Sequence, residues 1–380
     1  MKTKHKIIFN NSKNIEIIPS DSIDLVVTSP PYPMIKMWDD MFCSQNSSIK
    51  NALKKFSGSK AFELMHQELD KVWDGVYRIL KNGGFVCINI GDATRTLNGD
   101  FCLYSNHTRI LHYLLKIGFK ALPDILWRKQ TNAPNKFMGS GMLPAGAYVT
   151  LEHEYILIVR KGTKREFKKA DEKRNRRESA IFWEERNFLF SDIWMDVKGT
   201  KQELRDSKSR SRSAAYPFDI AYRLINMYSA RGDTVLDPFL GTGTTMAAAM
   251  ASARNSIGYE IDQSLKNTIY GIKSNIVSFS NQYIRNRIKK HIDFVAEKIQ
   301  SKESLKYINK FYGFPVITNQ EKELILNDLT EVSNLDKDTI EVSYSEEPQA
   351  QFCRDWETQF GMNLPTGFKH QKSIQKNRKI

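Results

Sequence analysis

The sequence predicts an α/β fold in which a mostly parallel sheet carries helices on both faces. Short apolar segments at residues 24–27, 85–90 and 155–159 have the composition of strands buried on both faces. A segment with apolar residues at helical spacing, residues 59–80, separates the first two. Residues 216–262 return to the same alternation. This rhythm of strand and helix is typical of a Rossmann-like sheet.

The composition of the chain favours some classes of function and argues against others. The chain has 380 residues, 41% of them hydrophobic, and a formal net charge of +14. Such a charge favours a polyanionic partner, although solubility alone would also explain it. The N-terminus has no secretory signal and nowhere do roughly 18 apolar residues run together, so we expect a soluble cytoplasmic protein without a membrane partner. Four cysteines and seven histidines lack metal-ligand spacing, which predicts structural roles and no metal site.

Changes in composition divide the chain into four parts. Residues 1–160 and 213–275 carry the strand and helix alternation, and residues 161–212 form a basic insert between them. The insert places an aromatic island, "IFWEERNFLFSDIW", between two runs rich in Lys and Arg. This pattern favours an element that contacts DNA, although a solvated or flexible insert would have a similar charge. We expect residues 276–380 to form a mainly helical extension whose basic helix, near residues 281–300, also contacts DNA.

The segment "TVLDPFLGTGTTMAAAM" predicts a ligand site. Asp237 ends a strand, Gly241 and Gly243 lie in the following turn, and a helix begins near Thr244. Ligands of α/β sheets bind beyond the carboxyl ends of the strands, where glycine lets the backbone come close. The loop is neither a triphosphate-binding P-loop nor the usual dinucleotide fingerprint, and Glu260 follows at the distance of a ribose-binding acid. The segment therefore predicts a nucleoside with a small anionic group, unless it is a plain strand-to-helix turn.

Together, "TSPPY" and "DPFLGTGTT" resemble motifs of the DNA amino-methyltransferases that use S-adenosyl-L-methionine. The catalytic motif comes first, as in the β arrangement of that family, and the resemblance covers about residues 23–262. It implies a methyltransferase fold with a target-recognition insert at residues 161–212. Where the family often has His-Pro this chain has Arg212-Ser213. The implied cofactor residues are Asp237, Phe239, Gly241, Gly243, Thr244 and Glu260, with Pro217 and Phe218 near the methionine moiety.

The resemblance implies that Ser29, Pro30, Pro31 and Tyr32 are the catalytic residues. The lone pair of an exocyclic amino group is delocalised into the base, so hydrogen-bond acceptors are needed to restore it. The Ser29 hydroxyl and the Pro30 carbonyl are suitable acceptors, and the prolines fix the direction of that carbonyl. Tyr32 offers a face on which a flipped base can stack. Methylation of cytosine C5 needs a cysteine nucleophile, typically after proline, and none of the four cysteines follows one.

The family associates Ser-Pro-Pro-Tyr mainly with cytosine N4 and Asp- or Asn-Pro-Pro-Tyr mainly with adenine N6. The sequence is therefore expected to encode a site-specific N4-cytosine methyltransferase of double-stranded DNA, associated with the nucleoid of a prokaryotic cell. We expect it to protect DNA from a cognate restriction endonuclease without forming a stable complex with it. Adenine N6 methylation, methylation of RNA or protein, and a DNA-binding regulator without turnover remain alternatives. The sequence does not specify the oligomeric state or the recognition site.

Overall fold

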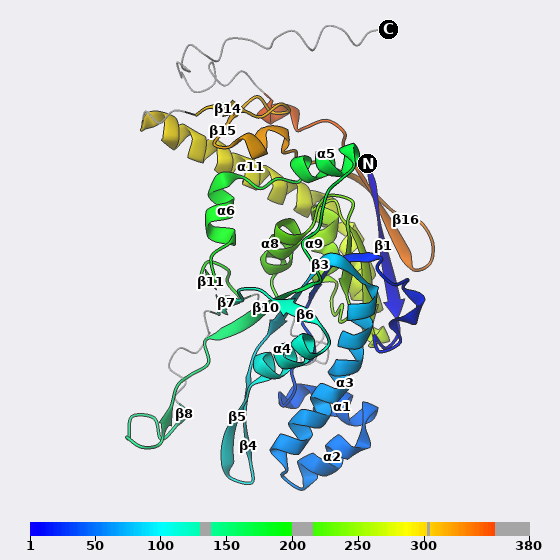
Figure 1. Cartoon of the computed structure of the whole chain (residues 1–380), viewed down its shortest axis with the longest axis vertical. Coiled ribbons are helices and arrows are strands. Elements are labelled where there is room, and N and C mark those ends of the chain that lie inside the picture. Colours follow the sequence, from blue (N-terminus) through cyan, green and yellow to red (C-terminus); the bar gives the residue numbers. More distant parts are fainter. Residues whose placement is uncertain (130–137, 200–215, 302–304, 354–380) are drawn as a thin grey trace.

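One sheet runs through the computed structural model, which describes residues 1–129, 138–199, 216–301 and 305–353 (Figure 1). Its 11 strands follow the order β11-β7-β10-β3-β2-β12-β13-β1-β17-β16, with β6 beside β10. The strands are β1 (Lys2–Phe9), β2 (Ile23–Thr28), β3 (Leu80–Ile90), β6 (Phe119–Ala121), β7 (Ile125–Arg128), β10 (His153–Lys161), β11 (Ile193–Trp194), β12 (Thr234–Asp237), β13 (Asn255–Glu260), β16 (Leu329–Asn334) and β17 (Thr339–Tyr344).

The centre of the sheet is parallel, and the strand next to it on each side pairs with it in antiparallel fashion. Strands β3, β2, β12, β13 and β1 pair in parallel, whereas β10 pairs with β3, and β17 with β1, in antiparallel fashion. Alternate residues of β2 face opposite layers: Val26 packs in one core cluster, and Leu25 and Val27 pack in another. Because both faces are buried, β2 is apolar along most of its length, as the sequence predicted.

Helices cover both faces of the sheet, so the predicted fold class is confirmed. Helices α3 (Gly58–Ile79) and α4 (Asn106–Lys116) share a core with one face, and α8 (Phe218–Tyr228) and α9 (Thr244–Ala251) share a core with the other. The remaining helices are α1 (Asp39–Gln45), α2 (Ser47–Lys54), α5 (Ala170–Glu178), α6 (Trp183–Leu189), α10 (Lys266–Gly271) and α11 (Ile276–Gln300). Among the described residues, none of these helices combines the length and apolarity needed to cross a bilayer.

Strand β1 was not predicted, and its buried side chains explain why. It alternates exposed lysines with the buried residues Thr3, His5 and Ile7. The polar residues are satisfied: Thr3 Oγ1 is 2.8 Å from His5 Nε2, and His5 Nδ1 is 2.9 Å from Ser256 Oγ. A strand that buries hydrogen-bonded polar groups gives little hydropathy signal.

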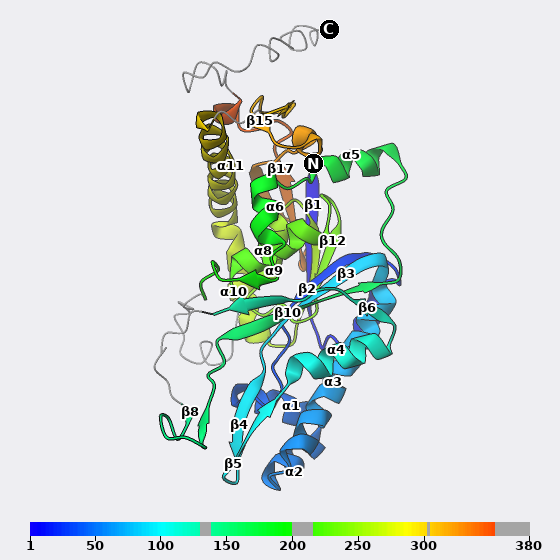
Figure 2. The ribbon, with the colours of Figure 1, turned by 60° about the vertical axis from the view of Figure 1, so that its left-hand side comes forward.

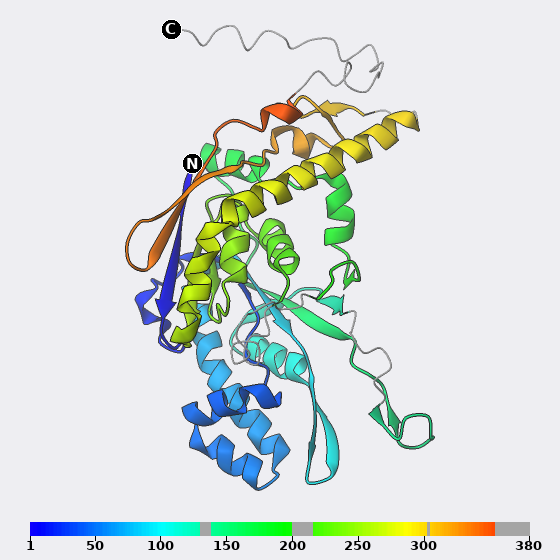
Figure 3. The same cartoon turned by 180° about the vertical axis from the view of Figure 1, so that it is seen from behind.

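The C-terminal extension agrees with the expectation of a helix only in its first part. Helix α11 runs across one side of the molecule (Figure 3). After it come the short strands β14 (Tyr307–Ile308) and β15 (Pro315–Val316), and then β16 and β17, which extend the central sheet beyond β1. The described residues 305–353 thus contribute strands to the central sheet.

Two hairpins project from the end of the molecule opposite α11 (Figure 2). One is formed by β4 (Ala93–Leu97) and β5 (Asp100–Tyr104), the other by β8 (Met138–Gly139) and β9 (Ala147–Tyr148). The rings of Phe101 and Tyr148 stack with their centroids 4.7 Å apart. This ring contact joins the two hairpins.

Candidate active site

Two loops, which are far apart in the sequence, meet at the carboxyl ends of β2 and β12. We call residues 29–34 the SPPY loop and residues 238–243 the glycine loop. Strands β2 and β12 are parallel neighbours, with Leu25 opposite Val235. At their ends Thr28 Oγ1 donates a 2.6 Å hydrogen bond to Asp237 Oδ1. The fold therefore places the two predicted motifs side by side.

Asp237 connects the two loops from within the core. Its side chain is only 2% exposed and also accepts hydrogen bonds from Thr245 Oγ1 at 2.5 Å and from the Phe239 backbone N–H at 3.0 Å. Burial raises the pKa of Asp237 to about 6. Its hydrogen bonds organise the strand ends, so the structure gives this predicted cofactor residue a supporting position beneath the loop.

The glycine loop turns tightly before α9. Gly241 and Gly243 have φ angles of +55° and +89°, a region that side chains disfavour. A Cβ on Gly243 would lie 2.6 Å from Ile272 Cδ1. Thr244 is the first residue of α9, so the loop presents backbone groups and a helix N-terminus at the sheet edge.

Glu260 ends β13 beside this loop. Its two carboxylate oxygens accept 2.8 Å hydrogen bonds from the backbone N–H groups of Gly241 and Asp262. Burial raises the pKa of Glu260 to about 7. A carboxylate has about four acceptor positions, so acceptor capacity is left for two ribose hydroxyls. The free acceptor positions of Glu260 thus fit the ribose hydroxyls of a nucleoside cofactor held against the glycine loop.

The other predicted cofactor residues lie around this centre. Phe239 is half-buried, with its ring edge-on to Trp73 at a centroid distance of 6.0 Å. Pro217 precedes α8, and Phe218 packs in an aromatic cluster with its ring 4.8 Å from that of Phe279. From this segment it is Tyr216, missed by the sequence analysis, whose hydroxyl bonds to Thr245 beside Asp237.

The SPPY loop brings Ser29 and Tyr32 together. Ser29 Oγ lies 3.2 Å from Tyr32 Oη, and both side chains are half-buried. Pro30 is buried and Pro31 is half-buried between them. The predicted catalytic residues therefore form one group next to Thr28 and the Asp237 centre.

Three residues missed by the sequence analysis support Tyr32. Tyr32 Oη donates a 2.9 Å hydrogen bond to Glu154 Oε2, and Asn89 Nδ2 donates to both Tyr32 Oη (2.9 Å) and Glu154 Oε2 (2.6 Å). The ammonium group of Lys129 pairs with the other oxygen of Glu154. A sequence signal existed: Asn89 and Glu154 are polar residues within or beside apolar strands, and buried polar groups need partners.

The backbone of the SPPY loop is anchored to α4. Asn106 is fully buried and its Nδ2 donates to the carbonyl oxygens of Pro33 (3.1 Å) and Gly91 (3.0 Å). Met34, which follows Pro33 in the SPPY loop, has a φ of +67°, which is uncommon for a residue with a side chain. This anchoring holds the loop in one conformation.

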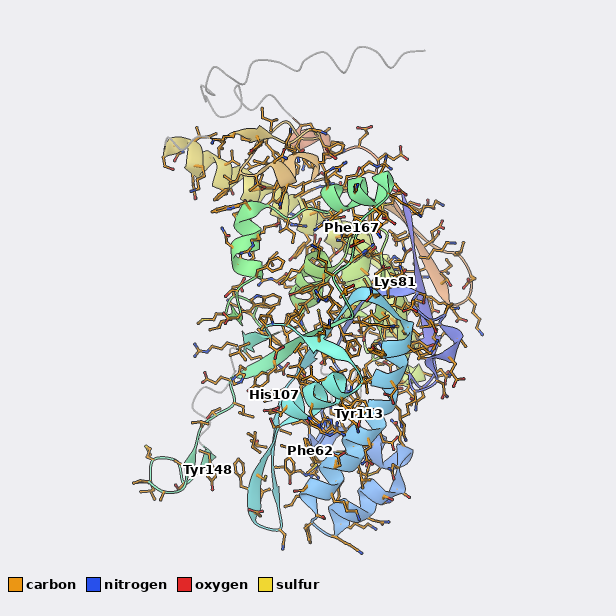
Figure 4. The ribbon with its side chains drawn as sticks, viewed as in Figure 1. Phe62, Lys81, His107, Tyr113, Tyr148 and Phe167 are labelled. Carbon is orange, nitrogen blue, oxygen red and sulfur yellow. The ribbon has the colours of Figure 1, made fainter. Side chains whose placement is uncertain are left out.

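The basic insert begins near the amino ends of β12 and β3, opposite to the strand ends that carry the two loops. Arg165 pairs with Asp233, which precedes β12, and packs against Gly83 at the start of β3. Figure 4 shows Phe167 and Lys81 well away from His107, which pairs with Asp92 just beyond the carboxyl end of β3. Residues 164–177, expected to contact DNA, thus lie away from the two loops, and residues 200–212 of the insert lie outside the described part.

Some basic side chains of the helix that was expected to contact DNA form ion pairs within the protein. On α11, Arg287 is 8% exposed and pairs with Glu185 of α6, and Arg285 Nη2 donates to Asp328 at 2.9 Å. Lys289 and Lys290 are exposed. Within residues 285–290 only part of the positive charge is therefore free to meet a polyanion.

Comparison with known proteins agrees with this geometry. A family model described as DNA methylase, covering N6 and N4 enzymes, matches residues 23–271. The chain is 52% identical over 327 residues to Type II methyltransferase M.MthZI of Methanothermobacter thermautotrophicus, covering 86% of this chain and 91% of that protein. It is 51% identical over 275 residues to Type II methyltransferase M.MjaI of Methanocaldococcus jannaschii, covering 70% and 89%.

A solved structure supports the cofactor assignment. A Thermus thermophilus protein described as a DNA modification methylase, complexed with S-adenosyl-L-methionine, superposes with a TM-score of 0.55 and 28% identity, covering 72% of this chain and 95% of that one. The cofactor of this chain is S-adenosyl-L-methionine, and the glycine loop with Glu260 fits it. The chain belongs to the N6/N4 family of DNA methylases.

Proposed function

We propose that this protein transfers the methyl group of S-adenosyl-L-methionine to the N4 amino group of a cytosine flipped out of double-stranded DNA at a specific site. The observation that carries the proposal is the hydrogen bond between Thr28 and Asp237, which joins the SPPY loop to the glycine loop. A base bound at Ser29 would lie beside a cofactor held at Glu260. Proximity of this kind supplies a large part of the acceleration in a two-substrate transfer.

The bound cofactor supplies a methyl group on a positively charged sulfur. The protein supplies acceptors and a stacking face. Ser29 Oγ and the Pro30 carbonyl would accept hydrogen bonds from the amino protons, which favours a pyramidal nitrogen and stabilises the positive charge that develops on it. The ring of Tyr32 would hold the flipped base by stacking. This chemistry needs no covalent intermediate on the protein.

The choice of cytosine over adenine depends on Ser29 and on the family association of Ser-Pro-Pro-Tyr with N4 methylation. Adenine N6 is the second candidate, because acceptors at the same two positions would also suit an adenine amino group. The two candidates give different products, N4-methylcytosine and N6-methyladenine, so the identity of the methylated nucleoside distinguishes them directly.

We further propose that methylation protects DNA from a cognate restriction endonuclease in a prokaryotic cytoplasm, without a stable complex between the two enzymes. Both archaeal relatives are named Type II methyltransferases, which supports this role. The net charge of +14 supports binding to DNA that weakens steeply with salt. A flat salt dependence of DNA affinity would count against the charge argument.

The test is transfer of a labelled methyl group from the cofactor to unmethylated genomic DNA, followed by digestion to nucleosides. We expect label in N4-methylcytosine. Label in N6-methyladenine would replace cytosine by the second candidate. No incorporation into DNA, with intact cofactor binding, would overturn the assignment and favour a binding protein without turnover. RNA and protein substrates serve as parallel controls.

A further inference from the structure

We propose that Glu154 and Asn89 are positioning residues that fix the direction of the Ser29 hydroxyl, so that its lone pairs face the target amino group. This inference rests on the proposed function. Glu154 ends up beside Tyr32 because β10 pairs with β3, and Asn89 stands on β3 opposite Ile156. The two side chains meet the SPPY loop from beneath, and both are buried, at 8% and 2% exposure.

The ion pair between Lys129 and Glu154 determines the direction of the other hydrogen bonds in this network. Lys129 can only donate, and it pairs with one oxygen of Glu154. The other oxygen of this carboxylate is an acceptor, so Tyr32 Oη, 2.9 Å away, must be the donor. Burial and the charge of Glu154 raise the pKa of Tyr32 well above its ordinary value. The phenol therefore keeps the one proton that it donates.

Asn89 reinforces the same direction. Its amide nitrogen donates to Glu154 Oε2 and to Tyr32 Oη, whereas its own Oδ1 has no hydrogen-bond partner among the described residues. The opposite amide orientation would put Oδ1 against the carboxylate, where two acceptors would repel each other. Asn89 thus occupies one acceptor position of the phenol oxygen.

These hydrogen bonds leave only one direction for the hydrogen bond between Ser29 and Tyr32. The phenol proton points to Glu154, so across the 3.2 Å contact Ser29 Oγ must donate and Tyr32 Oη must accept. With its proton turned towards Tyr32, the serine oxygen offers only lone pairs to the pocket. An amino group, which brings protons, matches this polarity, whereas a carbonyl oxygen at the same place would face an acceptor. The network therefore selects an amino group as the group bound at Ser29.

The variant Glu154→Gln tests the chain of donors. A glutamine has a single acceptor oxygen, for which Lys129 on one side and Tyr32 and Asn89 on the other would compete. The phenol proton would then no longer be fixed away from Ser29, and the serine proton could turn towards the substrate. We expect kcat for DNA methylation to fall about 10- to 100-fold while the affinities for the cofactor and DNA change by less than about 3-fold. The matched control is Glu68→Gln: Glu68 is also buried and bonded to two lysines, Lys13 and Lys71, and to the Asn46 amide, but none of these partners is in the SPPY loop. It should leave kcat unchanged.

A double-mutant cycle with Tyr32→Phe separates positioning from a general structural role. The phenylalanine keeps the stacking face and removes the phenol oxygen through which Glu154 acts. In this background Glu154→Gln should lower kcat by less than about 2-fold. If it keeps its full cost there, the inference is overturned while the proposed function stands. If Glu154→Gln impairs cofactor binding, Asn89→Ser takes its place in the cycle with the same two outcomes. Absence of DNA methylation by the wild-type chain overturns both the function and the inference.

Discussion

The SPPY loop and the glycine loop lie at neighbouring strand ends but are built in different ways. The glycine loop obtains its supports from nearby sequence: Asp237, Gly241, Gly243 and Glu260 fall within one strand, turn, helix and strand unit. The SPPY loop obtains its supports from β3, the residue after β7, β10 and α4, through Asn89, Lys129, Glu154 and Asn106. A site that positions a cofactor can thus be local, whereas the site that must orient a hydroxyl depends on side chains from distant segments.

The largest expected effect separates the roles of the two loops. Ser29→Ala removes the hydroxyl acceptor, and Tyr32→Ala removes the stacking face, but neither change touches Glu260 or the glycine loop. We expect kcat to fall by about 10²- to 10³-fold, with the cofactor dissociation constant unchanged. Single-turnover methylation and calorimetric cofactor titration measure the two quantities. A loss of cofactor affinity with kcat preserved would mean that the roles are misassigned.

The second effect concerns pH and the glycine loop. Burial raises the pKa of Glu260 from 4.5 to about 7, so the folded protein binds this proton more tightly than the unfolded chain. Its contribution to stability is complete below the unfolded pKa and is lost as pH rises through the folded one. Between pH of about 4 and about 8, the wild-type protein should lose about 3 kcal/mol more unfolding free energy than Glu260→Gln.

Urea denaturation of the cofactor-free proteins at several pH values measures this difference. Burial raises the pKa of Asp237 to about 6, and its charge adds to the raised pKa of Glu260, so the difference between the two proteins reports Glu260 together with this coupling. Equal pH slopes for the wild-type protein and Glu260→Gln would contradict the account of the buried carboxyl group.

A third, smaller effect tests the bond that joins the loops. Thr28→Val keeps the shape of the side chain and removes the donor to Asp237, which retains Thr245 and the Phe239 N–H as partners. We expect a loss of about 1–3 kcal/mol of unfolding free energy. The exposed Thr96→Val on β4 is the control and should stay within about 0.5 kcal/mol. Equal effects of the two substitutions would show that the bond to Asp237 contributes nothing.

The smallest effect compares the two glycines of the glycine loop. Both have positive φ, so an alanine costs about 1–2 kcal/mol at either position. At Gly243 the added Cβ also meets Ile272 Cδ1 at 2.6 Å, whereas at Gly241 the nearest atom is the Phe239 carbonyl oxygen at 3.9 Å. Gly243→Ala should therefore be the more destabilising by about 1 kcal/mol, as measured by urea unfolding. The reverse order would contradict this packing.

Much of the fold could be predicted from the sequence because its central strands are apolar and its helices are amphipathic. The expected strands at residues 24–27, 85–90 and 155–159 are β2, β3 and β10. Strand β1 escaped because its inward side includes Thr3 and His5, and β17 escaped because it pairs with β1, more than 300 residues away in the chain. Strand β16 joins the sheet only through β17. Long-range pairing of this kind leaves no local pattern.

The candidate site could be predicted where one motif holds all its parts. Ser29, Tyr32, Asp237 and Gly243 could be named because they sit inside two short motifs, and Glu260 because it ends the strand that follows the second one. The supports of Tyr32 could not, since a single Glu or Asn in a strand does not reveal its partner. The polarity of these residues within or beside apolar strands indicates that each has a buried partner, but it does not indicate which residue that partner is.

The central claim is that the joined loops methylate a cytosine amino group at a specific DNA site. Modification mapping by long-read sequencing tests it most directly, in cells that express the wild-type chain or Ser29→Ala from the same plasmid. We predict N4-methylcytosine at one short recurring sequence with the wild-type chain, and none with Ser29→Ala. Methylated adenine at the recurring sequence, or no modified sequence at all with well-expressed protein, would contradict the claim.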